Sequence, residues 1–369
     1  SSRHRVGEVV VAEVIDWATA ESVAVRSVGR EPFSRSYHYA SLQPDFTRFA
    51  ELAEAAVSAE TGLVSAAGPA RARVTDREGW VRANVASFRR LLRPLTDRLG
   101  EHMAAGPAAP FARRMAGAEL GMFLGWMSRR VLGQYDLLVI EDEDPEDQDI
   151  VYFVGPNVLG LERRFGFPPD EFRLWLALHE LTHRAQFTGV PWLREHFLGL
   201  VSTTFSALDP DPARVLKGLN LAVDEFRKGR NPLDDGGLAV LFASPEQRVA
   251  LDHLSGMMSL LEGHGDVTMN RAGAAEIPNG ERFHRILHAR RAQVNPVMKL
   301  IQKLIGLDAK MKQYQAGEDF IEAVEEVGGT AVLDLAFAAP QNLPTLAEIR
   351  DPEVWLQRMD LPRVAALSV

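Results

Sequence analysis

The chain has 369 residues, of which 46% are hydrophobic and 25% are charged, so it is long enough to bury a large core. The net charge of −9 argues against non-specific binding to nucleic acid, and we expect no nucleic-acid partner. The chain has no cysteine, which excludes a disulfide framework and fits a reducing compartment, so we expect a cytoplasmic protein.

The N-terminal part of the chain predicts mostly helices. Residues 9–14 fit either a strand or a helix, because their periodicity does not decide between the two. Helices are expected over residues 44–58 and 76–92. Between these two helices, residues 62–73 are rich in Ala and Gly, which favours a loop.

A Gly- and Pro-rich segment at residues 106–110 is the clearest break in the chain. It divides a mostly helical N-terminal region, residues 1–110, from a catalytic region, residues 111–369; one continuous domain is the alternative. The apolar helix expected over residues 115–127 contains Glu119 and is too short to span a bilayer, so we expect no membrane partner. Its glycines recur every four residues, a spacing that lets another helix approach closely.

Two short strands and several more helices follow. Residues 137–140 and 151–154 are expected to be strands on either side of an acidic segment, residues 141–149. We interpret that segment as a solvated loop, because it lacks the glycine spacing of a calcium-binding loop. The chain is therefore predicted to be mainly α with a small β element. Further helices are expected over residues 170–187, 191–208, 211–227, 244–270, 280–307 and 317–327.

The helix predicted at residues 170–187 contains the run His179-Glu180-Leu181-Thr182-His183. Residues four apart lie on one face of a helix, so two imidazoles can reach the same metal ion. The glutamate beside the first histidine then lies where a general base for a metal-bound water is needed. H-E-x-x-H on a helix is typical of zinc metallopeptidases. The alternative is a buried helix whose two histidines are satisfied by hydrogen bonds.

Catalytic zinc usually has three protein ligands and one water, so a third ligand is required. The best candidate is Glu262, on the helix predicted at residues 244–270. Asp266 lies one turn further along the same face, where it could accept the second ring N–H of a ligand histidine and fix its orientation. His264 is a rival third ligand, but it lies on another side of that helix, so Glu262 and His264 are not expected to bind the same ion.

These motifs resemble those of the gluzincins: H-E-x-x-H on one helix and E-x-x-x-D on a later one. More closely, the chain resembles an actinobacterial-type family of zincin-like hydrolases, once catalogued as a domain of unknown function, some of whose members are labelled coenzyme F420 biosynthesis-associated. The resemblance implies a mostly helical zincin-like metallopeptidase fold and metal-dependent hydrolysis. Zincins place an edge strand beside the motif helix, and residues 151–154 are our candidate for it. The segments that carry the resemblance are Gly125-Trp126, residues 131–136, Gly155-Pro156-Asn157, residues 172–175, residues 261–264, Gln313-Tyr314, Gly317-Glu318 with Phe320, and residues 342–345.

The expected chemistry follows from the zinc site. Zn²⁺ held by His179, His183 and Glu262 lowers the pKa of a bound water, and Glu180 takes its proton during attack on a carbonyl. The resulting oxyanion needs a further donor. His264, Tyr314 and Arg290 are residues of a suitable type, and Gln186 lies one turn past His183, where it could line the cleft.

Three functions stay open from the sequence. The first is a zinc-dependent metallopeptidase or amide hydrolase that acts on a peptide or a small amide. The second is a non-catalytic binding or scaffold protein that keeps the zincin fold. The third is a small-molecule enzyme associated with coenzyme F420 metabolism, which only the resemblance suggests. The presence of Glu180 favours catalysis, because a structural metal site does not need a general base.

Overall fold

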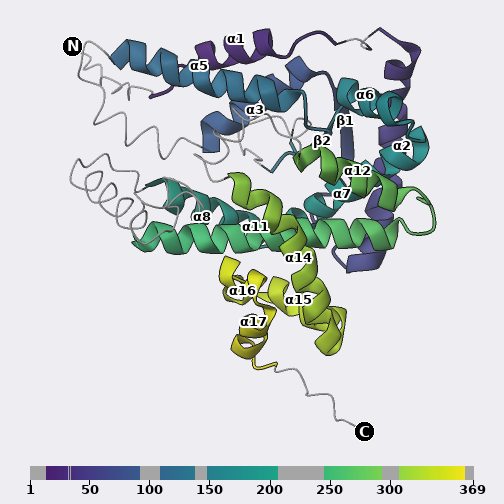
Figure 1. Ribbon diagram of the computed structural model, residues 1–369, viewed down its shortest axis with the longest axis vertical. Coiled ribbons are helices and arrows are strands. Elements are labelled where there is room, and N and C mark those ends of the chain that lie inside the picture. Colours follow the sequence, from purple (N-terminus) through teal and green to yellow (C-terminus); the bar gives the residue numbers. More distant parts are fainter. Residues whose placement is uncertain are drawn as a thin grey trace, which may run out of the picture. The chain divides into compact units, whose positions relative to one another are not determined.

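A computed structural model describes residues 14–31, 33, 35–91, 109–137, 148–206, 245–292 and 307–361 (Figure 1). The expected helix at residues 211–227 and the segment at residues 9–13 lie outside the described residues. The chain divides into two compact units. The first takes its described residues from segments 14–31 and 77–130, and the second from segments 33–76 and 131–361. The domain boundary near residue 110 stays a prediction, because the two compact units are defined by contacts and not by independent folding.

The first unit consists of α1 (Trp17–Ser27), α3 (Arg77–Leu91) and α5 (Ala109–Ser128). The glycine spacing of α5 has the structural role that the sequence predicted. A methyl group on Gly117 would lie 2.3 Å from the Asp16 carbonyl oxygen, and one on Gly121 would lie 2.4 Å from that of Ala20. The glycines thus let α5 pack with its backbone against α1. No helix among the described residues is both long and apolar enough to cross a membrane.

The second unit contains a three-stranded sheet of order β1-β3-β2. Its strands are β1 (Arg71–Thr75), β2 (Gly133–Tyr135) and β3 (Ile150–Val154); β3 pairs in parallel with β1 and antiparallel with β2.

The sheet corrects three expectations. The strand at residues 151–154 is central rather than the edge strand beside the motif helix, and β2 takes the edge. Leu137 lies outside any strand, while residues 138–140 are outside the described part of the chain. The segment expected to be a loop at residues 62–73 ends in β1, which forms because β3 supplies a partner for its backbone.

Helices surround this sheet in the second unit. The motif helix α7 (Pro169–Gly189) and α11 (Pro245–Ala272) agree with prediction within a few residues, whereas α2 (Tyr37–Thr61) begins earlier than expected because Ser36 caps it. The remaining helices are α6 (Gly155–Phe165), α8 (Leu193–Ser206), α12 (Gly280–Ala292), α14 (Leu307–Gly328), α15 (Thr330–Ala338), η2 (Pro340–Asn342), α16 (Leu346–Arg350) and α17 (Pro352–Arg358).

Two apolar clusters hold the second unit together. The larger one joins α2, β3, α6 and α7, and includes Phe46 stacked on Phe153 with ring centroids 3.9 Å apart. The other joins α11 and α14 to the C-terminal helices around Trp355, whose indole N–H donates to the Asn342 carbonyl oxygen. Figure 1 shows α14 crossing α11. Helix α11 contributes side chains to both clusters, and it also packs against α7.

Candidate metal centre

The helix α7 presents its histidines to α11 because its ends and its buried face are well defined by sequence. Pro169 occupies the first turn with Asp170 and Glu171, where a missing N–H and negative charge are both favourable. The rest of the helix is largely buried, with Leu178 and Leu181 in the larger apolar cluster. The periodicity that buries these leucines leaves the two motif histidines on the side that faces α11.

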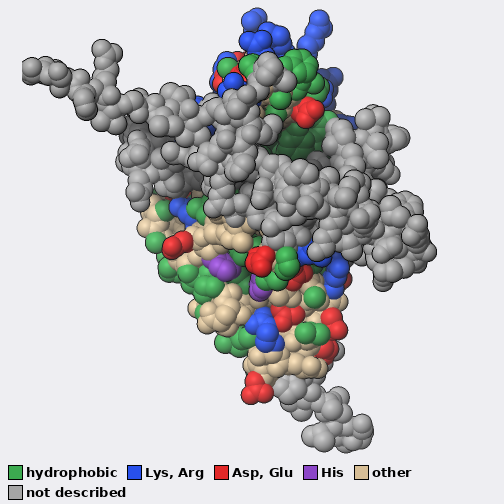
Figure 2. Space-filling model, turned by 90° about the vertical axis from the view of Figure 1, so that its left-hand side faces the viewer, with side chains coloured by type: hydrophobic (Ala, Val, Ile, Leu, Met, Phe, Trp, Pro, Cys, Tyr) green, Lys and Arg blue, Asp and Glu red, His purple; other side chains and the backbone are tan. Residues whose placement is uncertain are grey.

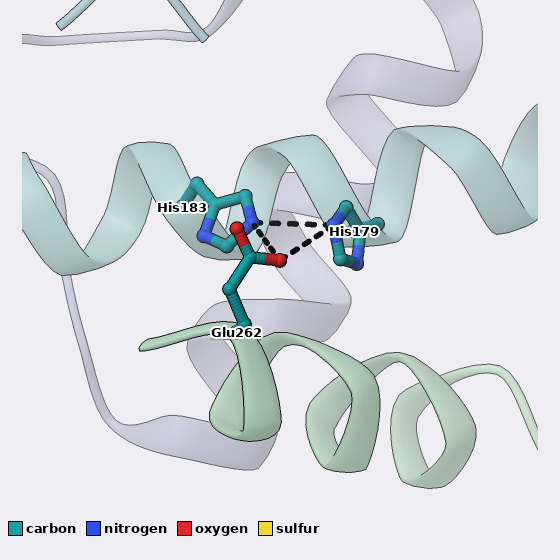
Figure 3. Close-up of side chains that lie close together, drawn as sticks. All are labelled: His179, His183 and Glu262. Carbon is teal, nitrogen blue, oxygen red and sulfur yellow. Dashed lines mark hydrogen bonds and ion pairs between the residues drawn. The ribbon is translucent and has the colours of Figure 1, made fainter. Parts of the chain in front are cut away.

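Three side chains from α7 and α11 converge on one point (Figure 3). The Nε2 atoms of His179 and His183 lie 3.2 Å apart, and Oε2 of Glu262 lies 3.8 and 3.7 Å from them. Ligand atoms bound tetrahedrally to zinc at about 2.0–2.1 Å lie about 3.3 Å from one another, so this donor set fits one such ion. Each of the three side chains keeps 15–18% of its surface exposed, so the donor set is not sealed from solvent.

Each histidine has a partner for its other ring nitrogen. Nδ1 of His179 faces Oδ1 of Asp266 at 3.4 Å, and Nδ1 of His183 faces Oε1 of Gln186 at 3.0 Å. Both partners are acceptors, so with a metal ion bound each Nδ1 would carry the hydrogen and each Nε2 would offer its lone pair to the metal. Without a metal ion, burial lowers the pKa of His179, but the hydrogen bond and charge of Asp266 outweigh it and raise that pKa to about 9.

Gln186 lies behind His183 and is fully buried. Its amide nitrogen donates to the Leu261 carbonyl oxygen at 3.0 Å and lies 2.9 Å from Nδ1 of His264. The His264 ring packs against Phe337, and burial together with the charge of His183 lowers the His264 pKa to about 4. The structure therefore places Gln186 and His264 behind the convergence point, and neither joins the three ligand atoms.

Glu180 lies between the two histidines and the edge strand β2. The backbone N–H of Tyr135 donates to its carboxylate, and burial followed by the charge of Glu262 raises its pKa against the opposing charges of the histidines. Gly133 allows this approach, since a methyl group there would lie 2.6–2.8 Å from three atoms of the Glu180 side chain. A carboxyl group with a raised pKa beside a metal-binding face is suited to act as a general base.

The strand β2 is itself fixed to α7 by buried ionic groups. The Tyr135 hydroxyl donates to Oδ1 of Asp149, and the fully buried guanidinium of Arg184 binds both Asp149 and Glu54. Arg184 follows His183 directly on α7. The same helix that carries the histidines therefore also positions the strand whose backbone holds Glu180.

Comparisons with known proteins identify the family of this chain. A profile of the zincin-like metallopeptidase family matches residues 15–356. The chain therefore belongs to the zincin-like metallopeptidase family. A crystal structure from Chloroflexus aurantiacus, described as a candidate hydrolase with a novel fold, is 30% identical, with a TM-score of 0.69, and the match covers 94% of this chain and 99% of that one. No significant match was found among curated proteins. Family and structural neighbour together support a hydrolase.

Some residues of this zincin-like site could not be identified from their local sequence. Glu318, from α14, hydrogen-bonds Asp266, and its pKa is raised to about 7 by burial and then by the charge of Asp266. Gly317 and Gly263 signal this contact, because α14 and α11 touch backbone to backbone there; a methyl group on Gly263 would lie 2.4 Å from the Gly317 carbonyl carbon. Of the other candidates, Tyr314 and Arg290 lie on helices at positions where the structure does not describe the side chains.

In the lower half of Figure 2, the described residues form no broad patch of one charge. Acidic, basic and apolar side chains lie interspersed there.

Proposed function

We propose that the protein is a zinc-dependent hydrolase of peptide or amide bonds. His179, His183 and Glu262 hold the zinc ion, and Glu180 acts as the general base. The observation that carries the proposal is the convergence of the three ligand atoms at 3.2–3.8 Å with the Glu180 carboxylate held beside them by the Tyr135 N–H. A purely structural metal site would not need that buried acid beside its ligands.

The chain's own residues supply the proton transfers. Zinc, when bound, lowers the pKa of a coordinated water and polarises the substrate carbonyl. Glu180 takes a proton from the attacking water and delivers it to the leaving amine. The Tyr135 N–H keeps the carboxylate oriented during both transfers, and the raised pKa of Glu180 makes it a stronger base than an exposed glutamate. Asp266 and Gln186 keep the two imidazoles in the tautomer that binds metal.

The edge strand supports a peptide as the substrate. Leu132 and Asp136 use their backbone groups to bind β3, through the Val154 N–H and the Ile150 carbonyl oxygen. The backbone groups of Gly133, which alternates with them, therefore point away from β3, along the outer edge of β2. An extended peptide can add to a strand edge through such groups, which brings its carbonyl next to the metal centre.

Metal content and turnover test the proposal together. Zinc retained after dialysis, measured by elemental analysis, should fall by one equivalent in Glu262→Gln and stay unchanged in Glu246→Gln, an exposed glutamate on the same helix. Glu180→Gln should keep its zinc and lose roughly 10²–10⁴-fold in turnover of a quenched fluorescent peptide library. Full metal binding with no hydrolysis of any peptide or small amide would favour the scaffold function, and hydrolysis restricted to small amides would favour the metabolic one. A protein that binds no zinc would refute the metallohydrolase proposal.

A further inference from the structure

A second group of metal-ligating side chains lies behind the first. Asp266, His284 and Glu318 come from α11, α12 and α14, and one ligand atom of each lies within 4.8 Å of the other two. Asp266 is 4% exposed, and the other two side chains are half-buried. Two carboxylates and one imidazole on three separate helices are a mixed ligand set rather than an acidic surface patch.

The carboxylate pair in this group needs positive charge or a shared proton. A ligand atom of Glu318 lies within 4.8 Å of one of Asp266, and the further charged neighbours that act on Glu318 are the acids Asp319 and Glu322. On its other side, Asp266 faces His179. Two carboxylates at this distance cannot both stay ionised without compensation. A divalent cation compensates both at once, and the glycine contact between α11 and α14 fixes the two carboxylates in place.

We propose that Asp266, His284 and Glu318 form a second divalent-cation site that joins α11, α12 and α14. This site goes beyond the proposed hydrolase function, since no step of that reaction uses it. Carboxylate and imidazole ligands together suit Zn²⁺ and Mn²⁺. Ca²⁺ is a poorer fit, because it takes six to eight oxygen ligands and this set includes a nitrogen.

The two sites are adjacent but separate. On α11, Glu262 belongs to the first site and Asp266 to the second; residues four apart on a helix are about 6 Å apart along its axis. Asp266 directs Oδ1 toward Nδ1 of His179, whose Nε2 faces the first site. An Asp266 variant would therefore disturb both sites, whereas Glu318 and His284 belong to the second site alone.

Stoichiometry of metal binding tests the proposal. The protein is stripped with a chelator and dialysed, then titrated calorimetrically with Zn²⁺ and, separately, with Mn²⁺. We expect two equivalents of Zn²⁺ in the wild type and one in each of Glu318→Gln and His284→Ala. Glu322→Gln, an exposed acid one turn along α14, is the matched control and should still bind two. Melting temperatures of the metal-free forms show that the variants fold.

The outcomes separate this site from the hydrolase site. Loss of one equivalent in Glu318→Gln and of a different one in Glu262→Gln supports both sites. If Glu262→Gln binds as the wild type does while the Glu318-dependent equivalent persists, the hydrolase site fails and the second site stands. If Glu318→Gln and His284→Ala bind as many equivalents of either metal as the wild type, the second site is refuted. A wild type that binds a single equivalent, lost only in Glu262→Gln, refutes it as well.

Discussion

Replacing Gln186 should weaken metal binding even though Gln186 does not reach the metal. Its Oε1 accepts a hydrogen bond from Nδ1 of His183, with the two atoms 3.0 Å apart, and its Nε2 donates to the Leu261 carbonyl oxygen at 3.0 Å. Gln186→Leu keeps a similar volume in a fully buried position but removes both of these contacts and the contact with Nδ1 of His264. The His183 ring can then rotate, and its Nδ1 hydrogen is left buried without this acceptor.

The magnitude follows from these two losses. Removing the group that orients a metal-ligating histidine typically weakens metal affinity about 10–100-fold, or about 1.4–2.7 kcal/mol. Leaving buried polar groups unsatisfied costs about 1–3 kcal/mol of folding stability. Gln186→Glu separates the two effects. It keeps an acceptor for His183, so zinc affinity should stay near that of the wild type, but it sets a carboxylate against the Leu261 carbonyl oxygen and should still lower stability.

The assay is a competition titration of zinc against a chromophoric chelator, with thermal unfolding of the metal-free protein in parallel. Gln247→Leu is the matched control, because Gln247 is a buried glutamine on α11 that donates to the Thr204 carbonyl oxygen, away from the histidines. It should lower stability and leave zinc affinity unchanged. A Gln186→Leu protein whose zinc affinity stays within threefold of the wild type would refute the orienting role.

One further substitution tests the position of Glu180, and another tests an ion pair in the C-terminal helices. Gly133→Ala should keep zinc but lower turnover by roughly 10²-fold, because its methyl group must displace Glu180 by nearly 1 Å, whereas Gly160→Ala, with open space at the same atom, should leave turnover unchanged. Burial raises the pKa of Glu348, but the hydrogen bonds from Arg358 and Thr345 together with the Arg358 charge outweigh it and lower that pKa below its ordinary value of 4.5. The stability this pair adds is therefore present at pH 7 and lost as the pH falls below 4.5. The difference in unfolding free energy between wild type and Glu348→Gln should shrink over that range; a pH-independent difference would refute this.

The helices of the site were predictable because residues at their ends mark where each helix begins and stops. Prolines mark the start of α7, and Gly189 with Pro191 marks its end, so the prediction missed by only one or two residues. The pair Glu262 and Asp266 could also be predicted from local sequence, because residues four apart on a helix lie on the same face.

The sheet and the carboxylate Glu318 were not predictable in this way. The strand β1 has an ordinary composition and forms because β3 lies beside it, and β2 is only three residues long. The side chain of Glu318 reaches Asp266 only because two helices far apart in sequence cross at glycines. Such contacts depend on tertiary packing, which a pattern within one segment does not encode.

The site divides into two parts that depend on different pairs of elements. The proposed metal binding depends on α7 against α11. Both histidines, Glu262 and Asp266 come from these helices, and Gln186 connects the helices through the Leu261 carbonyl oxygen. The proposed general base, Glu180, depends on α7 against β2, through the Tyr135 N–H and the missing side chain of Gly133. Substitutions in α11 should therefore lower metal content first and turnover as a consequence. Substitutions in β2 should lower turnover while the metal stays bound, so the two phenotypes distinguish a fault in ligand geometry from a fault in proton transfer.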